Sequence, residues 1–355
     1  MGKLLITGGT GFLGSHTCLV LIEAGYDIII LDSFINSSPI VIDKINKICG
    51  IKKDEITSNI NLIKGDIREE NIIDDIFTSE KSKGNPITGV IHFAGLKSVN
   101  ESIKDPFKYW DVNVNGCINL LKVMEANGCR TIVFSSSATI YGDPELLPIK
   151  EDAKIKPVNT YGNTKASIEK LLLDVSRINK DWKIACLRYF NPVGAHPSGS
   201  IGEAPNGNPN NLFPIVTKVA LGQLPQLNIY GGDWETPDGT CIRDYIHVMD
   251  LADGHLAALN YLKSTANEFL TLNLGTGKGY SVLEITRMFS KVINREIPYK
   301  IIDRRPGDVS KTIADPSKAK SMLGWECKRS LREICKHTWK WASSNPYGYQ
   351  EKVIN

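Results

Sequence analysis

The sequence predicts a doubly wound α/β fold, in which helices cover both faces of a parallel sheet, together with a second, smaller α/β lobe. Three observations predict it. Continuous apolar runs alternate with helical patterns over the first half of the chain, a glycine-rich turn follows the first run, and the composition changes after Asn191. Runs of Ile, Val and Leu between helices are typical of strands buried on both faces of a parallel sheet.

The strands are expected in chain order at these apolar runs. The first, "KLLIT" at 3–7, precedes a helical segment at 15–24. Further strands are predicted, with helical stretches between them, at 26–32, 60–66, 89–95, 131–138 and 183–191. This alternation is the pattern of a Rossmann-type sheet, whose ligands bind outside the carboxyl ends of the strands.

A loop-rich segment at 191–211 marks the main boundary, because it is dense in Gly, Pro, Asn and Ser, which favour turns. We expect a Rossmann domain at 1–190, and a segment near 240–275 is a candidate to form part of the same domain. The second lobe is then 191–355, built largely from loops and short helices. The boundary loop is either an ordinary connection or a lid.

Length and composition are those of a globular protein of two domains, or of one large domain with an added lobe. The net charge of +3 over 355 residues favours neither nucleic acid nor a charged membrane surface as a partner. We expect no signal peptide and no membrane span, because every apolar run is too short. Eight scattered cysteines without a C-x-x-C motif favour a reduced, cytoplasmic setting.

The glycine turn "TGGTGFLGS" has the spacing G-x-x-G-x-x-G at Gly8, Gly11 and Gly14. Glycine lets the backbone approach a pyrophosphate, and the following helix offers free N–H groups and a positive dipole end. Asp32 ends the second predicted strand, where a carboxylate accepts hydrogen bonds from a ribose 2′-OH and repels a 2′-phosphate. Because residues 33–36 include no arginine, NAD is favoured over NADP. Without this context the glycines would form an ordinary tight turn, and Asp32 would be a strand-end residue.

The stretch "TYGNTKA" places Tyr161 and Lys165 four residues apart at the expected start of a helix. Residues at i and i+4 share one helix face, so the phenol and the ammonium are neighbours. By themselves they are most simply a solvated helix face. Their place after the serine-rich strand end at 135–142 makes them candidates for a catalytic pair.

A set of motifs carries a family resemblance: "TGGTGFLGSH", "GDIR", "VIHFAGLKSV", "FSSSATIYGD", "YGNTK", "LRYFNPVGAHPSG" and "RDYIHVMDLADGH". They resemble those of UDP-glucose 4-epimerases, which are extended short-chain dehydrogenases/reductases. The resemblance spans nearly the whole chain and is weak only around 34–60 and near the C-terminus. It implies a firmly held NAD+, a UDP-hexose substrate and interconversion of UDP-glucose and UDP-galactose through a transient 4-keto sugar. The two lobes are then an NAD-binding domain and a UDP-sugar-binding lobe.

The chemistry requires a base at the sugar hydroxyl, and a base with a pKa near the working pH is most effective. A free tyrosine, with a pKa of ~10, is too basic. Lys165 and the positive ring of NAD+ would each favour the phenolate of Tyr161. Two unit charges at roughly 6 Å, with an effective dielectric constant of ~20, lower its pKa by about 4 units before desolvation opposes them. Ser137 matches the family serine that hydrogen-bonds the sugar O4 and relays its proton to Tyr161; otherwise it caps the next turn.

The expected ligand residues follow from the glycine turn, from the strand ends and from the resemblance. The catalytic residues are Ser137, Tyr161 and Lys165. NAD+ is expected to contact Gly8, Gly11, Phe12, Leu13, Gly14, Asp32, Asn36, Asp66, Ile67, Phe93, Ala94, Gly95, Lys97, Asn113, Ser135, Tyr161, Lys165 and Phe190. The UDP-hexose is expected to contact Lys97, Ser137, Tyr161, Tyr189, Asn191, Asn211, Leu212, Asn228, Ile229, Tyr230, Arg243, Arg305, Asp308 and Thr312. Tyr189 would by default be a core residue, and Arg243 outside this family a solvated charge.

Thr312 falls where some family members have a bulky tyrosine that narrows the sugar pocket. A smaller side chain admits a larger substituent at C2, so UDP-N-acetylhexosamines are expected as additional substrates.

Two alternatives stay open. A nucleotide-sugar 4,6-dehydratase of the same superfamily carries an acidic pair where this chain has Ala138 and Thr139, and elimination without it lacks its general acid. A dinucleotide-binding module without turnover has no need of Tyr161 and Lys165.

The resemblance also implies a homodimer, because family members commonly pair through helices of the NAD domain. The candidate segments are 106–127 and 167–178, although their apolar faces would equally cover the sheet. No metal site is expected, because the spacing along the chain of these histidines is not that of metal ligands. They are His16, His92, His196, His247 and His255.

Overall fold

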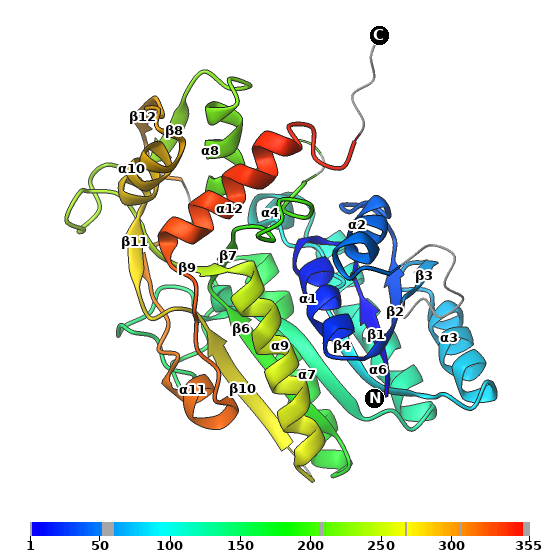
Figure 1. Cartoon of the computed structure of the whole chain (residues 1–355). Coiled ribbons are helices and arrows are strands. Elements are labelled where there is room, and N and C mark those ends of the chain that lie inside the picture. Colours follow the sequence, from blue (N-terminus) through cyan, green and yellow to red (C-terminus); the bar gives the residue numbers. More distant parts are fainter. Residues whose placement is uncertain are drawn as a thin grey trace.

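The computed structural model describes residues 2–51, 60–205, 207, 209, 211–266, 268–305 and 307–350 (Figure 1). Its main feature is a parallel seven-stranded sheet in the order β10-β6-β5-β4-β1-β2-β3. The strands are β1 (Lys3–Thr7), β2 (Asp27–Asp32), β3 (Ile60–Lys64), β4 (Ile87–His92), β5 (Thr131–Ser137), β6 (Lys183–Tyr189) and β10 (Glu268–Leu274). This confirms the predicted fold class, with strand ends displaced by at most three residues. β10, from the segment near 240–275, pairs with β6.

The strand order reverses at β1, which lies between β2 and β4. In such sheets ligands bind at the carboxyl ends of the strands, beside this reversal. Thr7 and His92, the last residues of β1 and β4, are register partners, and the backbone N–H groups of Phe93 and Ala94 both donate to the carbonyl oxygen of Thr7, at 2.9 and 3.0 Å. The glycine turn and the loop after β4 therefore start side by side.

Helices cover both faces of the sheet. One face packs against α1 (Phe12–Glu23), α2 (Ile40–Ile48) and α9 (Val248–Ser264), and the other against α3 (Glu70–Ser82), α6 (Gly116–Ala126) and α7 (Thr160–Ile178). Alternate residues of β1 point to opposite faces: Leu4 and Ile6 pack with α1, and Leu5 packs with α6. This double burial explains why the strands read as continuous apolar runs. Figure 1 shows α1 and α9 side by side on the near face.

Short helices precede α6 and follow β5. They are α4 (Val99–Lys104), α5 (Pro106–Tyr109), the π-helical η1 (Trp110–Asn115) and the 3₁₀-helical η2 (Ala138–Tyr141). Asn113 lies in η1. π-helical turns are rare and are frequently found at functional sites.

The second lobe contains two small sheets. One joins β7 (Asn191–Val193), β9 (Ile242–His247), β11 (Gly279–Ser281) and β13 (Lys311–Thr312), and the other pairs β8 (Leu227–Tyr230) with β12 (Tyr299–Ile302). Its helices are α8 (Leu212–Ala220), α10 (Val282–Ile293) and α12 (Leu331–Ser344), whereas α11 (Ser317–Leu323) packs against α9 and β10 of the main sheet.

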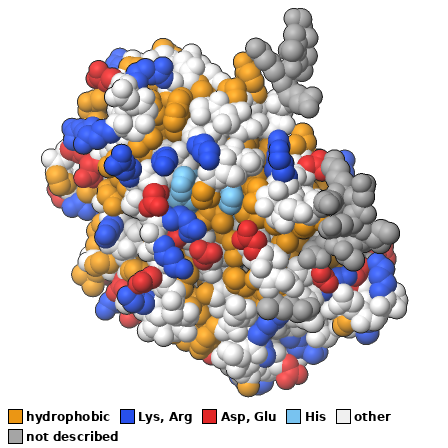
Figure 2. Space-filling view, viewed as in Figure 1, with side chains coloured by type: hydrophobic (Ala, Val, Ile, Leu, Met, Phe, Trp, Pro, Cys, Tyr) orange, Lys and Arg blue, Asp and Glu red, His pale blue; other side chains and the backbone are white. Residues whose placement is uncertain are grey.

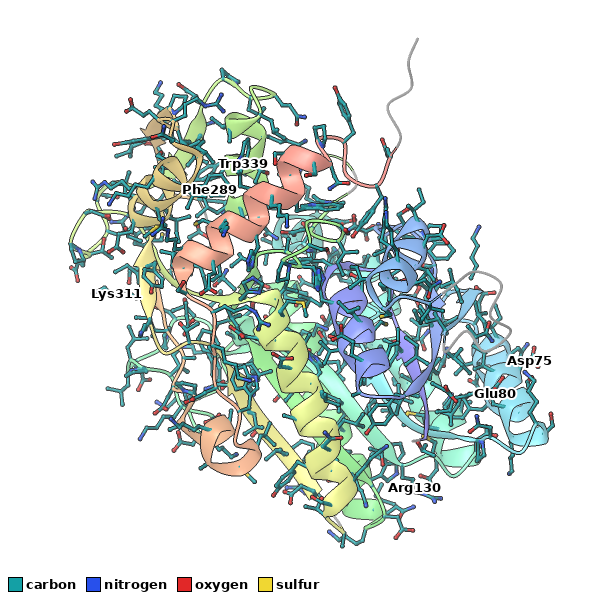
Figure 3. All side chains as sticks on the ribbon, in the orientation of Figure 1. Asp75, Glu80, Arg130, Phe289, Lys311 and Trp339 are labelled. Atoms are coloured by element: carbon teal, nitrogen blue, oxygen red, sulfur yellow. The ribbon has the colours of Figure 1, made fainter. Side chains whose placement is uncertain are left out.

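The second lobe is more regular than the expected loops and short helices. Capping boxes begin α10 at Ser281 and α12 at Ser330, and they satisfy the first N–H groups of each helix. Phe289 on α10 and Trp339 on α12 pack edge to face, with ring centroids 6.4 Å apart (Figure 3). The two helices therefore share one apolar core with α8.

No helix among the described residues is long and apolar enough to cross a membrane. On the face shown in Figure 2, acidic and basic side chains are interspersed, and histidine atoms reach the surface near its middle. The division into domains at residue 190 stays a prediction.

Candidate functional site

The glycine turn requires glycine at two of its three positions because of close packing. A Cβ on Gly14 would overlap the carbonyl oxygen of Gly8 and lie 2.7 Å from the Cα of Gly9. Gly8 has φ +71°, and a Cβ there would lie 2.7 Å from the backbone nitrogen of Ala94. Real Cβ atoms do not approach backbone this closely, so both glycines hold the turn tightly against α1 and the loop after β4.

Gly11 is different, because a Cβ there would meet only the carbonyl oxygen of Gly8, at 3.3 Å. The space outside Gly11 is open, and Gly11 is the N-cap of α1 without a side-chain acceptor for the first N–H groups. Free N–H groups at a helix start bind phosphate. The open space outside Gly11, which a side chain at this position would fill, is therefore suited to a pyrophosphate.

Asp32 is buried at the end of β2 and faces the glycine turn. Its Oδ2 accepts a hydrogen bond from the N–H of Thr10 at 3.0 Å, and its Oδ1 accepts from the N–H of Phe34 at 2.9 Å and the hydroxyl of Ser37 at 2.8 Å. These bonds use three of the roughly four lone-pair sites of a carboxylate. Asp32 fixes the turn and retains capacity for a ribose hydroxyl, so these residues fit NAD+.

The predicted catalytic residues meet where β5 ends and α7 begins. Asn159 caps α7 by accepting a hydrogen bond from the N–H of Gly162 at 2.9 Å. Lys165 is buried and donates from Nζ to the carbonyl oxygen of Ser135 at 2.7 Å, and its Nζ lies 5.8 Å from the ring centroid of Tyr161. The hydroxyl of Ser137 interacts with the phenol of Tyr161 and also accepts the N–H of Thr139 at 3.2 Å, so it caps η2 as well.

Burial dominates the electrostatics of this cluster. It raises the pKa of Tyr161 to about 12, against the smaller lowering effect of the Ser137 hydroxyl. Burial also lowers the pKa of Lys165 to about 8, opposed by Cys117 and Glu169. The protein by itself therefore holds Tyr161 as a neutral phenol at neutral pH. The lowering of about 4 units expected from two positive charges starts from this higher value.

The loop after β4 is tied to α7 through Asn113. Its Oδ1 accepts the N–H of Leu96 at 2.7 Å, and its Nδ2 donates to the carbonyl oxygen of Leu96 and the hydroxyl of Thr164, both at 3.1 Å. This brings Gly95 within reach of Lys165, because a Cβ on Gly95 would lie 3.9 Å from Nζ. Asn113, Gly95, Lys165 and Tyr161 therefore belong to one cluster.

The remaining predicted NAD+ contacts lie at neighbouring strand ends. Asp66 follows β3 and pairs with Arg68 at 2.8 Å, and the buried Ile67 packs with the core beneath α6. Phe93 lies 4.8 Å from the ring of His255 on α9. Asn36, at the tip of the loop after β2, is exposed. Phe190 is buried among η2 residues and Ala314.

The second lobe gathers several predicted substrate residues. Thr312 on β13 is the register partner of Arg243 on β9, so the two side-chain positions are adjacent. Arg305 pairs with Asp308 at 2.9 Å and lies 5.4 Å from the ring centroid of Tyr230, whose strand also carries Asn228 and Ile229. Asn228 and Tyr230 are exposed, whereas Ile229 is buried.

Lys97 and Asn211 meet at a carboxylate that the sequence did not indicate. Lys97 follows β4, and Asn211 is the N-cap of α8, directly before Leu212. Both donate to Oε1 of Glu203 at 3.2 Å. Residues from the two lobes are thereby joined across the site. Asn191 begins β7, beside Tyr245 of β9.

Tyr189 is placed differently from the other predicted substrate residues. It is buried at the end of β6, and its hydroxyl contacts Nε2 of His255. His255 donates from Nδ1 to the carbonyl oxygen of Leu251 at 2.9 Å, so its Nε2 accepts the phenol proton. The geometry places Tyr189 in the packing behind Phe93, and its contact with substrate stays a prediction.

No acid occupies the position where a dehydratase needs one. Ala138 is buried, and the hydroxyl of Thr139 lies 2.8 Å from that of Ser137. The phenol of Tyr161 and the hydroxyl of Ser137 are therefore the groups in this cluster that can exchange a proton with a substrate hydroxyl.

The fold, the glycine turn and the Ser137, Tyr161 and Lys165 cluster define an extended short-chain dehydrogenase/reductase. The chain is 49% identical over 348 residues to the UDP-glucose 4-epimerase of Bacillus subtilis, a match that covers 98% of each protein. The chain belongs to the family of UDP-glucose 4-epimerases.

Solved structures and a family model agree on the class. The UDP-glucose 4-epimerase of Bifidobacterium longum, crystallised with NAD+ and UDP, superposes with a TM-score of 0.91 at 43% identity, over 98% of this chain and 99% of that one. The UDP-Glc/GlcNAc 4-epimerase of Campylobacter jejuni superposes with a TM-score of 0.81 at 33% identity, over 97% and 100%. The model of the GDP-mannose 4,6 dehydratase family matches residues 5–338. The 49% identity to a named epimerase, over nearly the full length of both chains, favours epimerisation over the dehydratase alternative.

Sequence reasoning missed several residues that support the site: Ser136, Thr164, Glu169, Arg188 and Glu203. Two of them carried a usable signal. Glu169 is spaced i+4 from Lys165 and i+8 from Tyr161, and Ser136 lies between two predicted site serines. The others became visible only through contacts between distant segments.

Proposed function

We propose that this protein is an NAD-dependent UDP-hexose 4-epimerase, which interconverts UDP-glucose and UDP-galactose through a transient 4-keto sugar. The observation that carries the proposal is the cluster at the end of β5, where Tyr161 lies beside the hydroxyl of Ser137 and the ammonium of Lys165. Relatives that are named UDP-glucose 4-epimerases at up to 49% identity support the same reaction.

Each residue of the cluster has one task in the proposed reaction. Tyr161, as a phenolate, removes the proton of the sugar 4-hydroxyl and returns it to the 4-oxygen after the 4-keto sugar has rotated to present the opposite face of C4. Ser137 hydrogen-bonds the 4-oxygen and relays that proton. Lys165 favours the phenolate electrostatically. Bound NAD+ supplies a two-electron acceptor for C4 that returns the electrons, so no net oxidation results.

NAD+ would be held by the residues that the glycine turn and strand ends provide. The N–H groups at the start of α1, behind Gly11, suit the pyrophosphate, and Asp32 suits the adenosine ribose. The loop after β4, fixed by Asn113, lies beside Lys165. These roles rest on the placement of the residues and on the family.

The second lobe would hold the UDP group. Arg243 and Arg305 suit the diphosphate, because a guanidinium donates two parallel hydrogen bonds to phosphate oxygens. Tyr230 offers an exposed aromatic ring for the uracil base. Lys97, which follows β4, and Asn211, at the start of α8, both donate to Glu203, so this carboxylate links the NAD-binding half to the second lobe.

A coupled assay tests the proposal. The purified protein is mixed with UDP-galactose, and the UDP-glucose formed is oxidised by UDP-glucose dehydrogenase, which reports it as NADH. Formation of UDP-glucose that is lost in Tyr161→Phe supports the proposal. A keto-deoxy sugar would favour a dehydratase, and no product would favour a binding module.

We also propose that UDP-N-acetylhexosamines are substrates. Thr312 lies next to Arg243 in register, and its small side chain leaves room for an acetamido group at C2. The structural likeness to an enzyme named UDP-Glc/GlcNAc 4-epimerase supports this. The test is turnover of UDP-GlcNAc under conditions in which UDP-galactose reacts rapidly, and absence of turnover rejects it.

A homodimer is proposed on the basis of exposed apolar side chains on neighbouring helices. Phe107 on α5 is 86% exposed, and α4 and α5 pack beside α7, with Ser102 of α4 at its first turn. Ile103 and Trp110 add to the same group. Ile178, 87% exposed, lies at the opposite end of α7 and does not belong to this group. Clusters of this kind mark protein interfaces.

The cytoplasmic setting stays a prediction from the cysteines, which are free thiols here.

A further inference from the structure

Three consecutive serines of β5 contact three residues that recur every fourth position along α7. Ser137 interacts with Tyr161, the carbonyl oxygen of Ser135 accepts from Lys165, and the hydroxyl of Ser136 donates to Oε1 of Glu169 at 2.5 Å. Positions i, i+4 and i+8 lie on one helix face. Only the last pair has no assigned role in the reaction.

The pair at Glu169 is part of a buried and well-satisfied polar network. Arg188 on β6 donates to both carboxylate oxygens of Glu169, at 2.7 Å from Nη2 and 3.0 Å from Nε. Its Nη1 donates to the hydroxyl of Tyr141 at 2.9 Å and to the carbonyl oxygen of Glu151 at 2.8 Å. Glu169 and Arg188 are only 7% and 5% exposed. A buried ion pair contributes little net stability compared with apolar packing, so its presence one turn from Lys165 invites a further explanation.

We propose that Glu169 is a positioning residue of the epimerase site, which keeps Lys165 protonated and holds α7 in register with the serines of β5, while Arg188 limits its charge. The inference rests on the proposed roles of Tyr161 and Lys165. Ser136 and Arg188 fix the carboxylate of Glu169, so its charge stays one helical turn from the ammonium.

Cys117 and Glu169 both raise the pKa of Lys165, Cys117 more strongly, but burial raises the pKa of the Cys117 thiol to about 12 and keeps it neutral near pH 7. Glu169 is therefore the main anionic neighbour of Lys165 among the described residues. Burial and the absence of bulk water penalise the ammonium, and its pKa lies near 8 as a result. The carbonyl of Ser135 and the ring of Phe134, with its centroid 4.9 Å from Nζ, partly offset this penalty. The titratable and charged groups around it are His92 on β4, Cys117 on α6, Tyr161 and Glu169 on α7, and Cys186 and Arg188 on β6.

The sign of the effect follows from these charges. Removing the negative charge of Glu169 leaves Arg188 uncompensated and lowers the pH at which Lys165 loses its proton. Neutralising Arg188 leaves Glu169 uncompensated and raises that pH. Both changes damage the same ion pair, so a purely structural role predicts similar losses for both, without opposite pH shifts.

The experiment compares Glu169→Gln and Arg188→Gln with the wild-type holoenzyme. The alkaline limb of kcat/KM against pH should move down by roughly one pH unit in E169Q and up in R188Q. A second readout needs no turnover: the ammonium of Lys165 is titrated by nuclear magnetic resonance of protein labelled with 13C at lysine Cε, with the Lys165→Met counterpart of each variant for assignment. Its midpoint should fall in E169Q and rise in R188Q, because the charge of Glu169 stabilises the ammonium and the charge of Arg188 opposes it.

Glu80→Gln is the matched control. Glu80 is also a buried carboxylate paired with a cation, Lys3, but Lys3 begins β1 at the opposite end of the sheet from the site. Figure 3 places Glu80 on α3, on the far side of the molecule from the second lobe. E80Q should leave the alkaline limb and the Lys165 midpoint unchanged.

Unchanged limbs and midpoints in E169Q and R188Q, or shifts in the same direction, would overturn the proposal. If E169Q does not fold, Glu169→Asp replaces it. The shorter side chain moves the carboxylate away from Lys165, so the alkaline limb of kcat/KM should move to lower pH by less than one unit. An unmoved alkaline limb would count against the proposal. If the wild-type protein shows no epimerase activity, the proposed function fails, while the Lys165 titration still tests the charge coupling.

Discussion

His247 and His337 share a hydrogen bond of 3.0 Å between Nε2 of the first and Nδ1 of the second. His247 accepts the N–H of Met249 at its Nδ1, so its single proton resides on Nε2 and is donated to His337. Because His247 caps α9 and His337 lies on α12, the pair joins the helix that packs on the sheet to the last helix of the second lobe.

The protein should lose stability at mildly acidic pH, well above the pH range in which its carboxyl groups titrate. Burial lowers the pKa of His247 to about 2, of His92 to about 3, and of His16 and His255 to about 4. Below a pH of ~6.5 the unfolded chain binds protons that the folded protein does not, so stability falls as pH falls, by up to about 1.4 kcal/mol per pH unit for each histidine. Urea unfolding at a pH of about 7.5 and about 5.5 measures this. Equal stability at the two values would contradict it.

Alanine at two positions of the glycine turn should have separable effects. Gly14→Ala places a Cβ against backbone atoms of Gly8 and Gly9, so we expect a loss of roughly 3 kcal/mol or more in stability. Gly11→Ala meets no such obstacle and has φ −71°, so stability should change little while NAD+ binding weakens at least about tenfold. Denaturation and calorimetric titration with NAD+ distinguish the two. Equal behaviour of the variants would argue against the cradle at Gly11.

The phenol of Tyr161 should become more acidic when NAD+ binds. Its pKa of about 12 reflects burial. A positive charge nearby lowers it by about 2 pH units at roughly 6 Å and an effective dielectric constant of ~20. Ultraviolet titration of the protein with and without NAD+, with Tyr161→Phe as the reference, measures the shift. An unmoved midpoint would mean that the cofactor charge does not reach the phenol.

Thr312→Tyr should change substrate preference without disturbing the fold. Thr312 is partly exposed on the two-residue strand β13, so a larger side chain there should not disturb the buried core. We expect the ratio of kcat/KM for UDP-GlcNAc to that for UDP-glucose to fall at least tenfold, or about 1.4 kcal/mol. Thr312→Ser serves as the control and should leave the ratio nearly unchanged. An unaltered ratio in the tyrosine variant would show that residue 312 does not face C2.

A charge at the apolar cluster on α5 should dissociate a dimer. Phe107→Glu introduces a carboxylate at an 86% exposed position, so the monomer should keep its stability to within about 0.5 kcal/mol. Burying that charge in an interface is costly, so the apparent mass in sedimentation should fall by half. Tyr299→Glu, at an exposed apolar position of the second lobe, is the control. A monomeric wild-type protein would reject the proposed dimer.

The regular parts of the NAD-binding half were predictable because local pattern and tertiary environment agree there. β1 is buried on both faces, so "KLLIT" reads as a strand with the observed bounds. The start of α7 was also predictable, because Asn159 caps it and Tyr161 and Lys165 then share a face. β10 was only suggested, because its place beside β6 depends on a pairing between distant segments.

The sequence alone predicted the fold class, the glycine turn with Asp32, and the pair Tyr161 and Lys165, because each rests on short-range spacing, whereas Ser137 followed from the family resemblance. Only the tertiary structure decided which groups surround that set: Glu169 and Arg188 behind Lys165, Glu203 between Lys97 and Asn211, and His255 at Tyr189. It also decided the direction in which burial moves the pKa of Tyr161 and Lys165. Desolvation and long-range hydrogen bonds depend on what packs around a residue, and spacing along the chain carries no record of that.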